Sequence, residues 1–252
     1  MRKLIILGTG NLAYHLYEAV LPLENWEVVQ VYNHRSESLS DFQETTAVTT
    51  DLGELVDANL ILCCLKDDLI ETYFEKLTDK KCLIAHTSGA KKIQKTRGRT
   101  GVFYPLQSFS KYKMMDYTQI PFCIEAKRSD DLKILEDLAL SISESVYRIS
   151  SKKRLQMHLA AVFVNNFSNY MFKLGQDLCI ENHIDEEILI PLIQETFEKL
   201  KDLKAVEAQT GPAIRQDKKT IDNHLKLLKD QPKHEIYKLI SKHIQNDYGK
   251  KL

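Results

Sequence analysis

The sequence carries no net charge and contains no long apolar run, and these two absences exclude whole classes of protein. Its 35 lysines and arginines are balanced by 35 aspartates and glutamates. Such a chain has no overall field that would attract nucleic acid or an anionic membrane surface. No stretch reaches the roughly 18 apolar residues that a membrane-spanning helix needs, and the apolar stretch before Gly8 is too short for a signal peptide. We expect a cytoplasmic protein that binds neither nucleic acid nor membrane.

Cysteine is scarce and lacks the spacing of a metal site. Five cysteines occur, at Cys63, Cys64, Cys82, Cys123 and Cys179. Their number is odd, and no pair has the spacing of zinc ligands. A reduced protein without a metal centre is therefore expected. The sequence also lacks internal repeats and low-complexity tracts, and its one dense basic run, KKIQKTRGR, is interpreted as a solvated loop or helix face.

What the sequence does contain is a regular alternation of strand and helix patterns up to about residue 150. Apolar runs predict strands at 3–7, 27–32, 58–65, 81–86, 101–106, 121–126 and 145–149. Between these runs, amphipathic patterns predict helices at 11–21, 67–77 and 130–143. The alternation predicts a mostly parallel sheet with helices on both faces.

Beyond Ser150 the strand patterns stop, and helical patterns follow at 152–182, 185–203, 216–230 and 232–248. We therefore predict an α/β fold in two domains. A Rossmann-type domain spans 1–149, and an all-α domain spans 150–252. The helices of the second domain have apolar faces with little else in the chain to cover them, so we also predict a homodimer formed through this domain.

The first strand-to-helix turn, within LIILGTGNLAYHL, has the pattern of a dinucleotide cradle. A glycine stands where the strand must turn sharply, a second stands where the backbone must approach a pyrophosphate, and an alanine replaces the third. Backbone N–H groups at the start of the helix would then face the phosphates. The predicted cofactor-binding residues here are Gly8, Thr9, Gly10, Asn11 and Leu12. A glycine-rich turn without a ligand is the alternative.

The end of the second strand indicates which dinucleotide binds. NAD-binding folds place an acidic residue near this point to hold the ribose 2′-hydroxyl. This chain has Asn33 there, followed by His34, Arg35 and Ser36. An arginine can grip a 2′-phosphate with two hydrogen bonds, and a serine hydroxyl can add a third. We therefore expect NADP as the cofactor, with an ordinary polar loop as the alternative.

The ends of the next two predicted strands carry further candidates, because ligands of such sheets bind at the carboxyl ends of the strands. Leu65 and Lys66 are expected beside the cofactor. His86 and Ser88 are expected where the nicotinamide ring should lie. Since histidine titrates near neutral pH, His86 is a candidate proton donor, and a buried structural histidine is the alternative.

Candidate substrate contacts follow the strand at 101–106 and recur in the helical half. Tyr104 and Gln107 belong to a polar group after an apolar strand, which forms either a substrate wall or a turn with local hydrogen bonds. Arg215 lies in a break between helices, where it could bind a substrate carboxylate or phosphate, or pair with Asp217. Neither alternative is favoured by the sequence.

The first long helical pattern contains three more polar candidates. His158, Asn165 and Asn169 are spaced seven and four residues apart, so in an α-helix they share one face. Amides within an apolar helix cost stability unless they are paired. They are therefore either satisfied structural residues or substrate contacts, and His158 is a second candidate proton donor.

Six motifs in order, GTGNLAYHL, HTSGA, FYPLQSFS, HLAAVFVNNFSN, PLIQET and QTGPAIRQD, resemble a bacterial family of Rossmann-like NADP oxidoreductases. In that family the C-terminal part is a domain of unknown function, which would begin here near Ile120. More distantly, the chain is similar to pyrroline-5-carboxylate reductase, deazaflavin-dependent NADP oxidoreductase and the β-hydroxyacid dehydrogenases. The resemblance implies NADP on the first domain, a small-molecule substrate between the domains, and dimers formed by the helical domain.

The sequence departs from the β-hydroxyacid dehydrogenases at one catalytic position. Those enzymes have a lysine four residues before an asparagine on the first long helix, where this chain has Ala161 before Asn165 and Val162 before Asn166. A different proton donor is therefore needed, with His86 and His158 as the candidates. Two hypotheses stay open: a reductase that transfers hydride between NADP(H) and a small imine or carbonyl compound, and a non-catalytic NADP-binding sensor or partner-binding protein.

Overall fold

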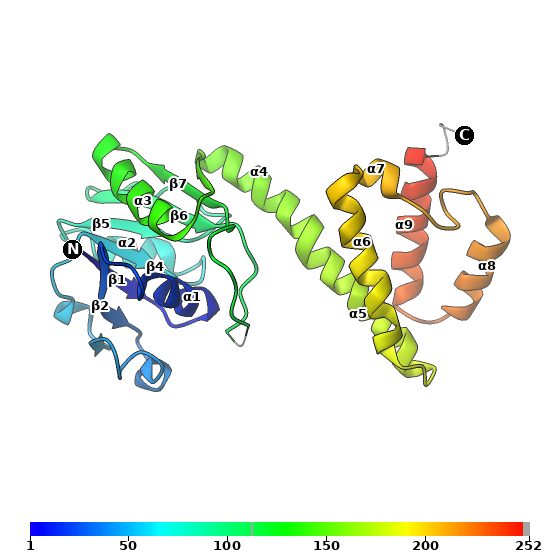
Figure 1. The fold of residues 1–252 in the computed structure, drawn as a ribbon, viewed down its shortest axis with the longest axis horizontal. Coiled ribbons are helices and arrows are strands. Elements are labelled where there is room, and N and C mark those ends of the chain that lie inside the picture. The colour runs from blue at the N-terminus through cyan, green and yellow to red at the C-terminus, as the bar shows by residue number, and fades with distance from the viewer. Residues whose placement is uncertain (112, 249–252) are drawn as a thin grey trace. The chain divides into compact units, whose positions relative to one another are not determined.

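The computed structural model describes residues 1–111 and 113–248, and Figure 1 shows its sheet and helices. The N-terminal part contains one eight-stranded sheet. The strands are β1 (Arg2–Leu7), β2 (Trp26–Tyr32), β3 (Val48–Thr49), β4 (Leu60–Cys63), β5 (Leu83–His86), β6 (Arg99–Pro105), β7 (Phe122–Ala126) and β8 (Val146–Arg148). Their order across the sheet is β3-β2-β1-β4-β5-β6-β7-β8.

Neighbouring strands run parallel except β6 and β7, which are antiparallel. The predicted mostly parallel sheet is confirmed. Strands β1 to β6 therefore end at one edge, which we call the carboxyl edge, whereas β7 and β8 end at the opposite one. The chain continues from β1 to β2 on one side and later to β4 on the other, so the carboxyl end of β1 is the switch point where ligands of such sheets bind.

Helices cover both faces of the sheet, as predicted. On one face, α1 (Asn11–Val20) and α3 (Ser129–Ile142) contribute to a single apolar cluster together with β1. Leu16 and Val20 of α1, four residues apart and both buried, belong to this cluster because they share one side of the helix. On the other face, α2 (Ile70–Lys76) contributes to a second apolar cluster.

After β8 the described chain is helical. The α-helices are α4 (Ser151–Ala161), α5 (Ser168–Glu181), α6 (Ile190–Asp202), α7 (Ala205–Ala208), α8 (Lys218–Leu227) and α9 (Lys233–Tyr248). Short 3₁₀ helices occur at Ser36–Leu39, Leu52–Glu54 and Glu186–Leu189. The change from strands to helices was predicted correctly, but the first long helix is interrupted by a π-helical segment, Val162–Phe167.

The chain forms two compact units, Met1–Asn165 and Asn166–Leu252. The division lies inside the π-helical segment, 17 residues after the sheet ends at Arg148. Helix α4 therefore belongs to the first unit together with the sheet. The boundary predicted at residues 149/150 stays a prediction.

The second unit buries few side chains. Among its described residues the buried ones are Ala213, Ile221, Leu228 and Ser241. Large apolar side chains are exposed instead, for example Leu192 at 65% and Leu227 at 77%. Within the described ranges no helix is both long and apolar enough to cross a membrane.

Two local features differ from the sequence-based expectations. Strand β3 has two residues and was not predicted, because a run this short gives no periodic signal. The helix predicted at 67–77 begins only at Ile70, because the residues before it form a turn that ends at Leu69.

Gly8 shapes the turn from β1 into α1. Its φ of 105° lies in the left-handed region, which residues other than glycine rarely adopt. A Cβ added here would also overlap the carbonyl oxygen of Cys64, which follows β4. The turn can therefore lie against the neighbouring strand only because residue 8 has no side chain.

We predict that Gly8→Ala lowers the free energy of unfolding by at least about 2 kcal/mol, because backbone strain and steric overlap add. Gly10→Ala is the matched control: Gly10 has a φ of −72°, and an added Cβ meets nothing within 4 Å. The control should stay within about 1 kcal/mol of the wild type. Urea denaturation of the three proteins measures this, and equal stability of both variants would refute the steric argument.

Candidate functional site

The turn after β1 leaves donors free at the carboxyl edge. Gly10 caps α1 without any side-chain hydrogen bond, and the space beside its Cα is open. Within the described chain, the first N–H groups of α1 have no hydrogen-bond partner. Ala13, in the place of the third glycine, is fully buried, so the helix packs closely on the sheet. This geometry fits a phosphate group approaching the helix N-terminus.

The loop after β2 is tied to this turn. The Asn33 side-chain amide donates to Thr9 Oγ1 at 2.5 Å, and the Arg35 backbone N–H donates to Asn33 Oδ1 at 3.1 Å. His34, Arg35 and Ser36 are exposed. The Arg35 guanidinium makes no hydrogen bond or ion pair with any described residue, so it is available to an anion. Asn33 thus connects the predicted phosphate and ribose sites.

The remaining residues predicted near the cofactor lie along the same edge. Leu65 is half-buried beside Gly8, and Lys66 is exposed. Asn11 uses its side chain to donate to the Phe109 carbonyl oxygen at 3.0 Å, which ties the start of α1 to the loop after β6. Gln107 in that loop is exposed, and its Oε1 accepts the Ser108 backbone N–H at 2.8 Å.

A buried histidine holds the same loop from the helix side. The His15 ring lies 2.9 Å from the Tyr117 hydroxyl through Nδ1 and 2.9 Å from the Ser110 carbonyl oxygen through Nε2. Because a carbonyl only accepts, Nε2 carries a proton, and in the neutral ring Nδ1 accepts from Tyr117. Lys111 also pairs with Asp41. Ser110 and Tyr117 are therefore fixed against α1, next to the cradle.

His86 ends β5 as predicted, but both its ring nitrogens are occupied by backbone groups. The Ser88 N–H donates to Nδ1 at 3.2 Å, so Nε2 carries the proton and donates to the Lys92 carbonyl oxygen at 3.1 Å. The ring is fully buried. Burial, followed by the positive charge of Arg154, lowers the pKa of His86 to about 4. This geometry corresponds to the structural alternative and leaves no free nitrogen to protonate a substrate.

Ser88 shapes the loop that follows β5. Its hydroxyl oxygen accepts the backbone N–H groups of Ala90 at 3.1 Å and Lys91 at 3.0 Å. Those bonds use the oxygen as an acceptor, and its proton remains available to a ligand. The backbone of the loop is therefore held by side chains at both ends, from Ser88 and from His86.

Tyr104 and His158, predicted separately, lie together. The Tyr104 hydroxyl is 3.1 Å from His158 Nδ1, and the two rings meet edge to face. Burial raises the pKa of Tyr104, so its hydroxyl stays protonated at neutral pH. His158 is half-buried, and its Nε2 has no hydrogen bond to any described residue.

Gly89 allows this pair to form. A Cβ added to Gly89 would lie 2.6 Å from His158 Nδ1 and 2.8 Å from Tyr104 Cζ. The backbone of the β5 loop therefore contacts both rings directly. Only glycine fits at this position, which gives the glycine of the HTSGA motif a physical reason.

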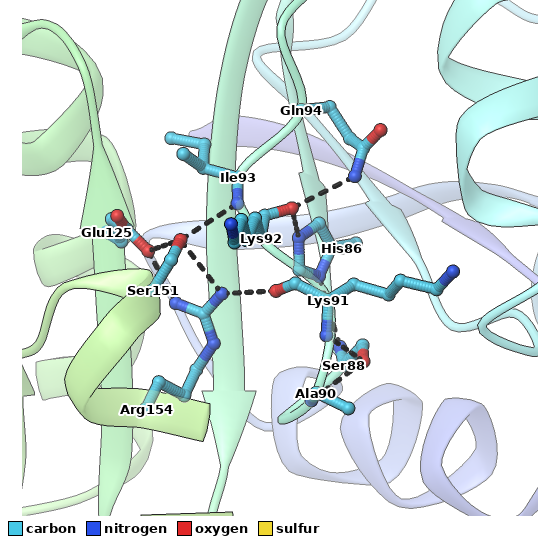
Figure 2. Close-up of polar contacts among 10 residues, drawn as sticks. All are labelled: His86, Ser88, Ala90, Lys91, Lys92, Ile93, Gln94, Glu125, Ser151 and Arg154. Carbon is cyan, nitrogen blue, oxygen red and sulfur yellow. Dashed lines mark hydrogen bonds and ion pairs between the residues drawn. The ribbon is translucent and has the colours of Figure 1, made fainter. Parts of the chain in front are cut away.

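A buried ion pair lies behind this loop. Arg154 of α4 is fully buried and binds Glu125 of β7 through Nη1 at 2.5 Å. Its Nη2 donates to the Lys91 carbonyl oxygen at 2.5 Å, as Figure 2 shows. Sequence patterns did not identify either residue, because an arginine in a basic helix start is usually solvated.

The remaining predicted substrate residues belong to the helical half of the chain. Asn165 lies in the π-helical segment and is exposed, whereas Asn169 and Arg215 belong to the second unit and are exposed. A π-helical turn contains more residues than an α-helical turn, so a seven-residue spacing across it does not return to the same face. The shared face predicted for His158 and Asn165 assumed an uninterrupted α-helix. Asp217 caps α8 and accepts the Thr220 N–H at 3.0 Å.

Among the described residues, no cluster of three histidine, cysteine or acidic side chains is placed to hold a metal ion. The candidate site consists of the phosphate cradle at the start of α1, the unpaired Arg35 and the Tyr104–His158 pair. All of them lie in the first unit, at or beside the carboxyl edge of the sheet.

Comparison with known proteins gives this arrangement a family. The "putative NADP oxidoreductase" of Bacteroides fragilis has 36% sequence identity and a TM-score of 0.89, over 97% of this chain and 98% of that one. This chain belongs to the family of that protein. Residues 120–244 also match the sequence profile of a domain of unknown function, DUF2520. The resemblance inferred from the motifs is confirmed, including the start of that domain near Ile120.

Two more distant structures share the fold. Pyrroline-5-carboxylate reductase from Streptococcus pyogenes has 16% identity and a TM-score of 0.64 over 98% of both chains. The reductive aminase from Aspergillus terreus, in complex with NADPH and ethyl levulinate, has 12% identity and a TM-score of 0.70 over 99% of this chain and 95% of that one. No curated protein matches the sequence.

The environment of His86 generates a pH-dependent prediction. Its folded pKa of about 4 lies below the ordinary 6.5, so the unfolded state binds the proton more tightly. The stability that neutral His86 contributes is therefore fully present above pH 6.5 and is lost as the pH falls toward 4. At 1.36 kcal/mol per pKa unit, the loss totals roughly 3 kcal/mol.

In His86→Gln the side chain can still donate and accept hydrogen bonds but does not titrate. The part of the stability loss at low pH that is due to His86 should therefore be absent in this variant. Urea denaturation of both proteins at several pH values between about 7.5 and 4 measures the difference. Parallel stability curves for the two proteins would contradict the assigned environment.

Proposed function

We propose that this protein is an NADP(H)-dependent oxidoreductase that transfers a hydride to or from a small imine or carbonyl compound. The observation that carries the proposal is the cradle: free N–H groups at the start of α1, open space at Gly10 and an unpaired Arg35 on the adjoining loop. The family relative and the fold relatives with NADP chemistry support it. When bound, NADPH would supply the hydride.

The cofactor preference rests on the loop after β2. Gly8 to Leu12 would hold the pyrophosphate, and His34, Arg35 and Ser36 would surround the ribose 2′-position. Asn33 is uncharged and already bonded to Thr9, so no carboxylate at this point repels a 2′-phosphate. Leu65, Lys66 and Ser88 would contact the cofactor further along the edge.

The proton donor in this proposal is His158. If Tyr104 donates to Nδ1, neutral His158 carries its proton on Nε2, and in the protonated ring Nδ1–H donates to the tyrosine oxygen instead. In either state Nε2–H points away from Tyr104 and is available to a substrate. Tyr104 therefore orients the ring, and His86 is left with a structural role. Gln107, Asn165, Asn169 and Arg215 remain candidate substrate contacts.

We also propose a homodimer formed through the helical residues. The second unit leaves apolar side chains exposed on α6, α8 and α9, including Leu192, Leu227 and Leu239. Monomeric proteins rarely expose so many large apolar side chains in so small a unit. A second copy offers the same apolar surface, which a two-fold interface requires.

We predict that NADPH binds more tightly than NADH and that Arg35→Ala removes the preference. A charge-assisted pair with the 2′-phosphate contributes about 1.5–3 kcal/mol, roughly ten- to a hundredfold in affinity. Calorimetric titration of both cofactors measures this. Arg128→Ala is the matched control, an exposed arginine beyond β7 at the opposite edge. Equal affinities in the wild type would eliminate the proposed 2′-phosphate site.

We predict that His158→Gln lowers turnover by about a hundredfold or more while NADPH affinity changes only a fewfold, the usual scale for one acid–base group. Tyr104→Phe should lower turnover roughly tenfold, the value of one orienting hydrogen bond. A substrate is first sought by screening imines and carbonyl metabolites for NADPH oxidation. Unchanged turnover in His158→Gln would exclude it as donor, and tight NADPH binding without any turnover would favour the sensor hypothesis.

We predict that light scattering finds a dimer at micromolar concentration. Leu192→Glu on α6, which places a charge on the exposed apolar surface, should weaken the association. Leu140→Glu is the control, because this leucine on α3 is 60% exposed but belongs to the first unit. A monomeric wild type would contradict the proposed dimer.

A further inference from the structure

The fully buried Arg154 binds groups from three different parts of the chain. Its guanidinium reaches Glu125 on β7, the Lys91 carbonyl oxygen in the β5 loop, and Ser151 Oγ at 3.3 Å on its own helix. Figure 2 shows it between these partners. A buried ion pair is a weak source of net stability, because desolvation offsets much of the attraction. We therefore infer the role of Arg154 from the positions of its partners and not from the energy of the ion pair.

The ion pair fixes how α4 lies on the sheet. In the antiparallel β6–β7 pair, Tyr104 is opposite Cys123, and Glu125 is two residues further along β7. Since side chains alternate along a strand, these three project from the same face. Helix α4 contacts all three: Arg154 binds Glu125, Met157 Sδ lies 3.9 Å from Cys123 Sγ, and His158 meets Tyr104.

The spacing of these contacts matches one face of a helix. Arg154, Met157 and His158 stand at positions i, i+3 and i+4, which are neighbours on an α-helix surface. Arg154 is thus one turn before His158. Any shift of α4 along the strands that breaks the ion pair also moves the His158 ring away from Tyr104.

The same guanidinium also binds the loop that contacts the ring pair. Lys91 is held through its carbonyl by Arg154, Lys92 through its carbonyl by His86, and Ile93 through its N–H by Ser151 Oγ at 2.9 Å. Gly89, two residues before Lys91, contacts both the Tyr104 and His158 rings. Arg154 therefore ties the helix that carries His158 both to β7 and to the loop that packs on the His158 ring, and His86 and Ser151 hold the neighbouring residues of that loop.

We propose that Arg154 is a positioning residue for His158: through Glu125 and the Lys91 carbonyl, it holds the His158 ring at Tyr104 and beside Gly89. The role in proton transfer rests on the function proposed above, whereas the placement of the ring does not. Because Arg154 is fully buried, it would act through His158 and not by touching a substrate itself.

The substitutions that test this keep each side chain close to its natural size. Arg154→Lys keeps the charge but loses the planar fork that reaches two acceptors in different directions. Glu125→Gln keeps an acceptor oxygen but removes the charge, and it does not touch His158. Glu136→Gln is the matched control, because Glu136 forms an ion pair with Arg148 at 2.7 Å on the surface. Tyr104→Phe serves as the reference, because in this variant the His158 ring has lost its hydrogen bond to the Tyr104 hydroxyl.

The readout is the ring nitrogen signals of His158 in protein labelled with ¹⁵N-histidine, assigned by their loss in His158→Gln. We expect Glu125→Gln and Arg154→Lys to move these signals in the direction of Tyr104→Phe, and Glu136→Gln to leave them unchanged. Wild-type His158 signals in both Glu125→Gln and Arg154→Lys would overturn the proposal. Should one of these two variants fail to fold, the other still decides.

Titration of NADPH into the same samples separates this proposal from the proposed function. Displaced His158 signals in a protein that binds no NADPH would support the positioning role and overturn the function. With a substrate in hand, both variants should lower kcat at least tenfold while the Kd for NADPH stays within a fewfold. A loss confined to NADPH affinity would overturn the positioning role.

Discussion

The reversal of chain direction between β6 and β7 is the constraint on which the candidate site depends. Because the two strands are antiparallel, the chain leaves β6 and enters β7 at the same edge. Phe109 and Ser110 of the connecting loop therefore lie beside the turn after β1, where they contact Asn11 and His15 of α1. A parallel β7 would have required a crossover to the opposite edge, and that segment would have been lost from the site.

The reversal also sets the face on which α4 packs. It brings Tyr104 and Glu125 onto one side of the sheet, so a single helix contacts both. Two polar side chains near this face are buried with partners: Arg154 pairs with Glu125 through Nη1, and His86 binds two backbone groups. Of these two side chains, only the Nε of Arg154 has no hydrogen-bond partner among the described residues. Such groups are costly to bury alone but fix geometry when paired. The site is therefore rigid where the proposed chemistry needs direction, and open at Gly10 and Arg35.

The parts of the fold that local patterns encode could be read from the sequence. Alternating apolar runs predicted the parallel strands, and the GTG turn predicted the cradle, because strand and turn preferences depend on neighbours within a few residues. Tyr104 and His158 were identified as candidates one at a time, but their 54-residue separation hid the contact. Arg154 was missed for the same reason, since its partner Glu125 lies on another element. The partners of His86 are two backbone groups, the Ser88 N–H and the Lys92 carbonyl, and the pattern of side chains in a sequence does not predict where backbone groups lie.

The contacts of His15 have a consequence for the order of folding. Helix α1 is made from residues near the start of the chain, but its outer side is closed by Ser110 and Tyr117, 95 and 102 positions later. Contacts across such separations form slowly, because a long loop must close first. During synthesis the cradle can therefore fold locally while its cover is still missing. The helix acquires that cover only once the sixth strand and the loop after it have left the ribosome.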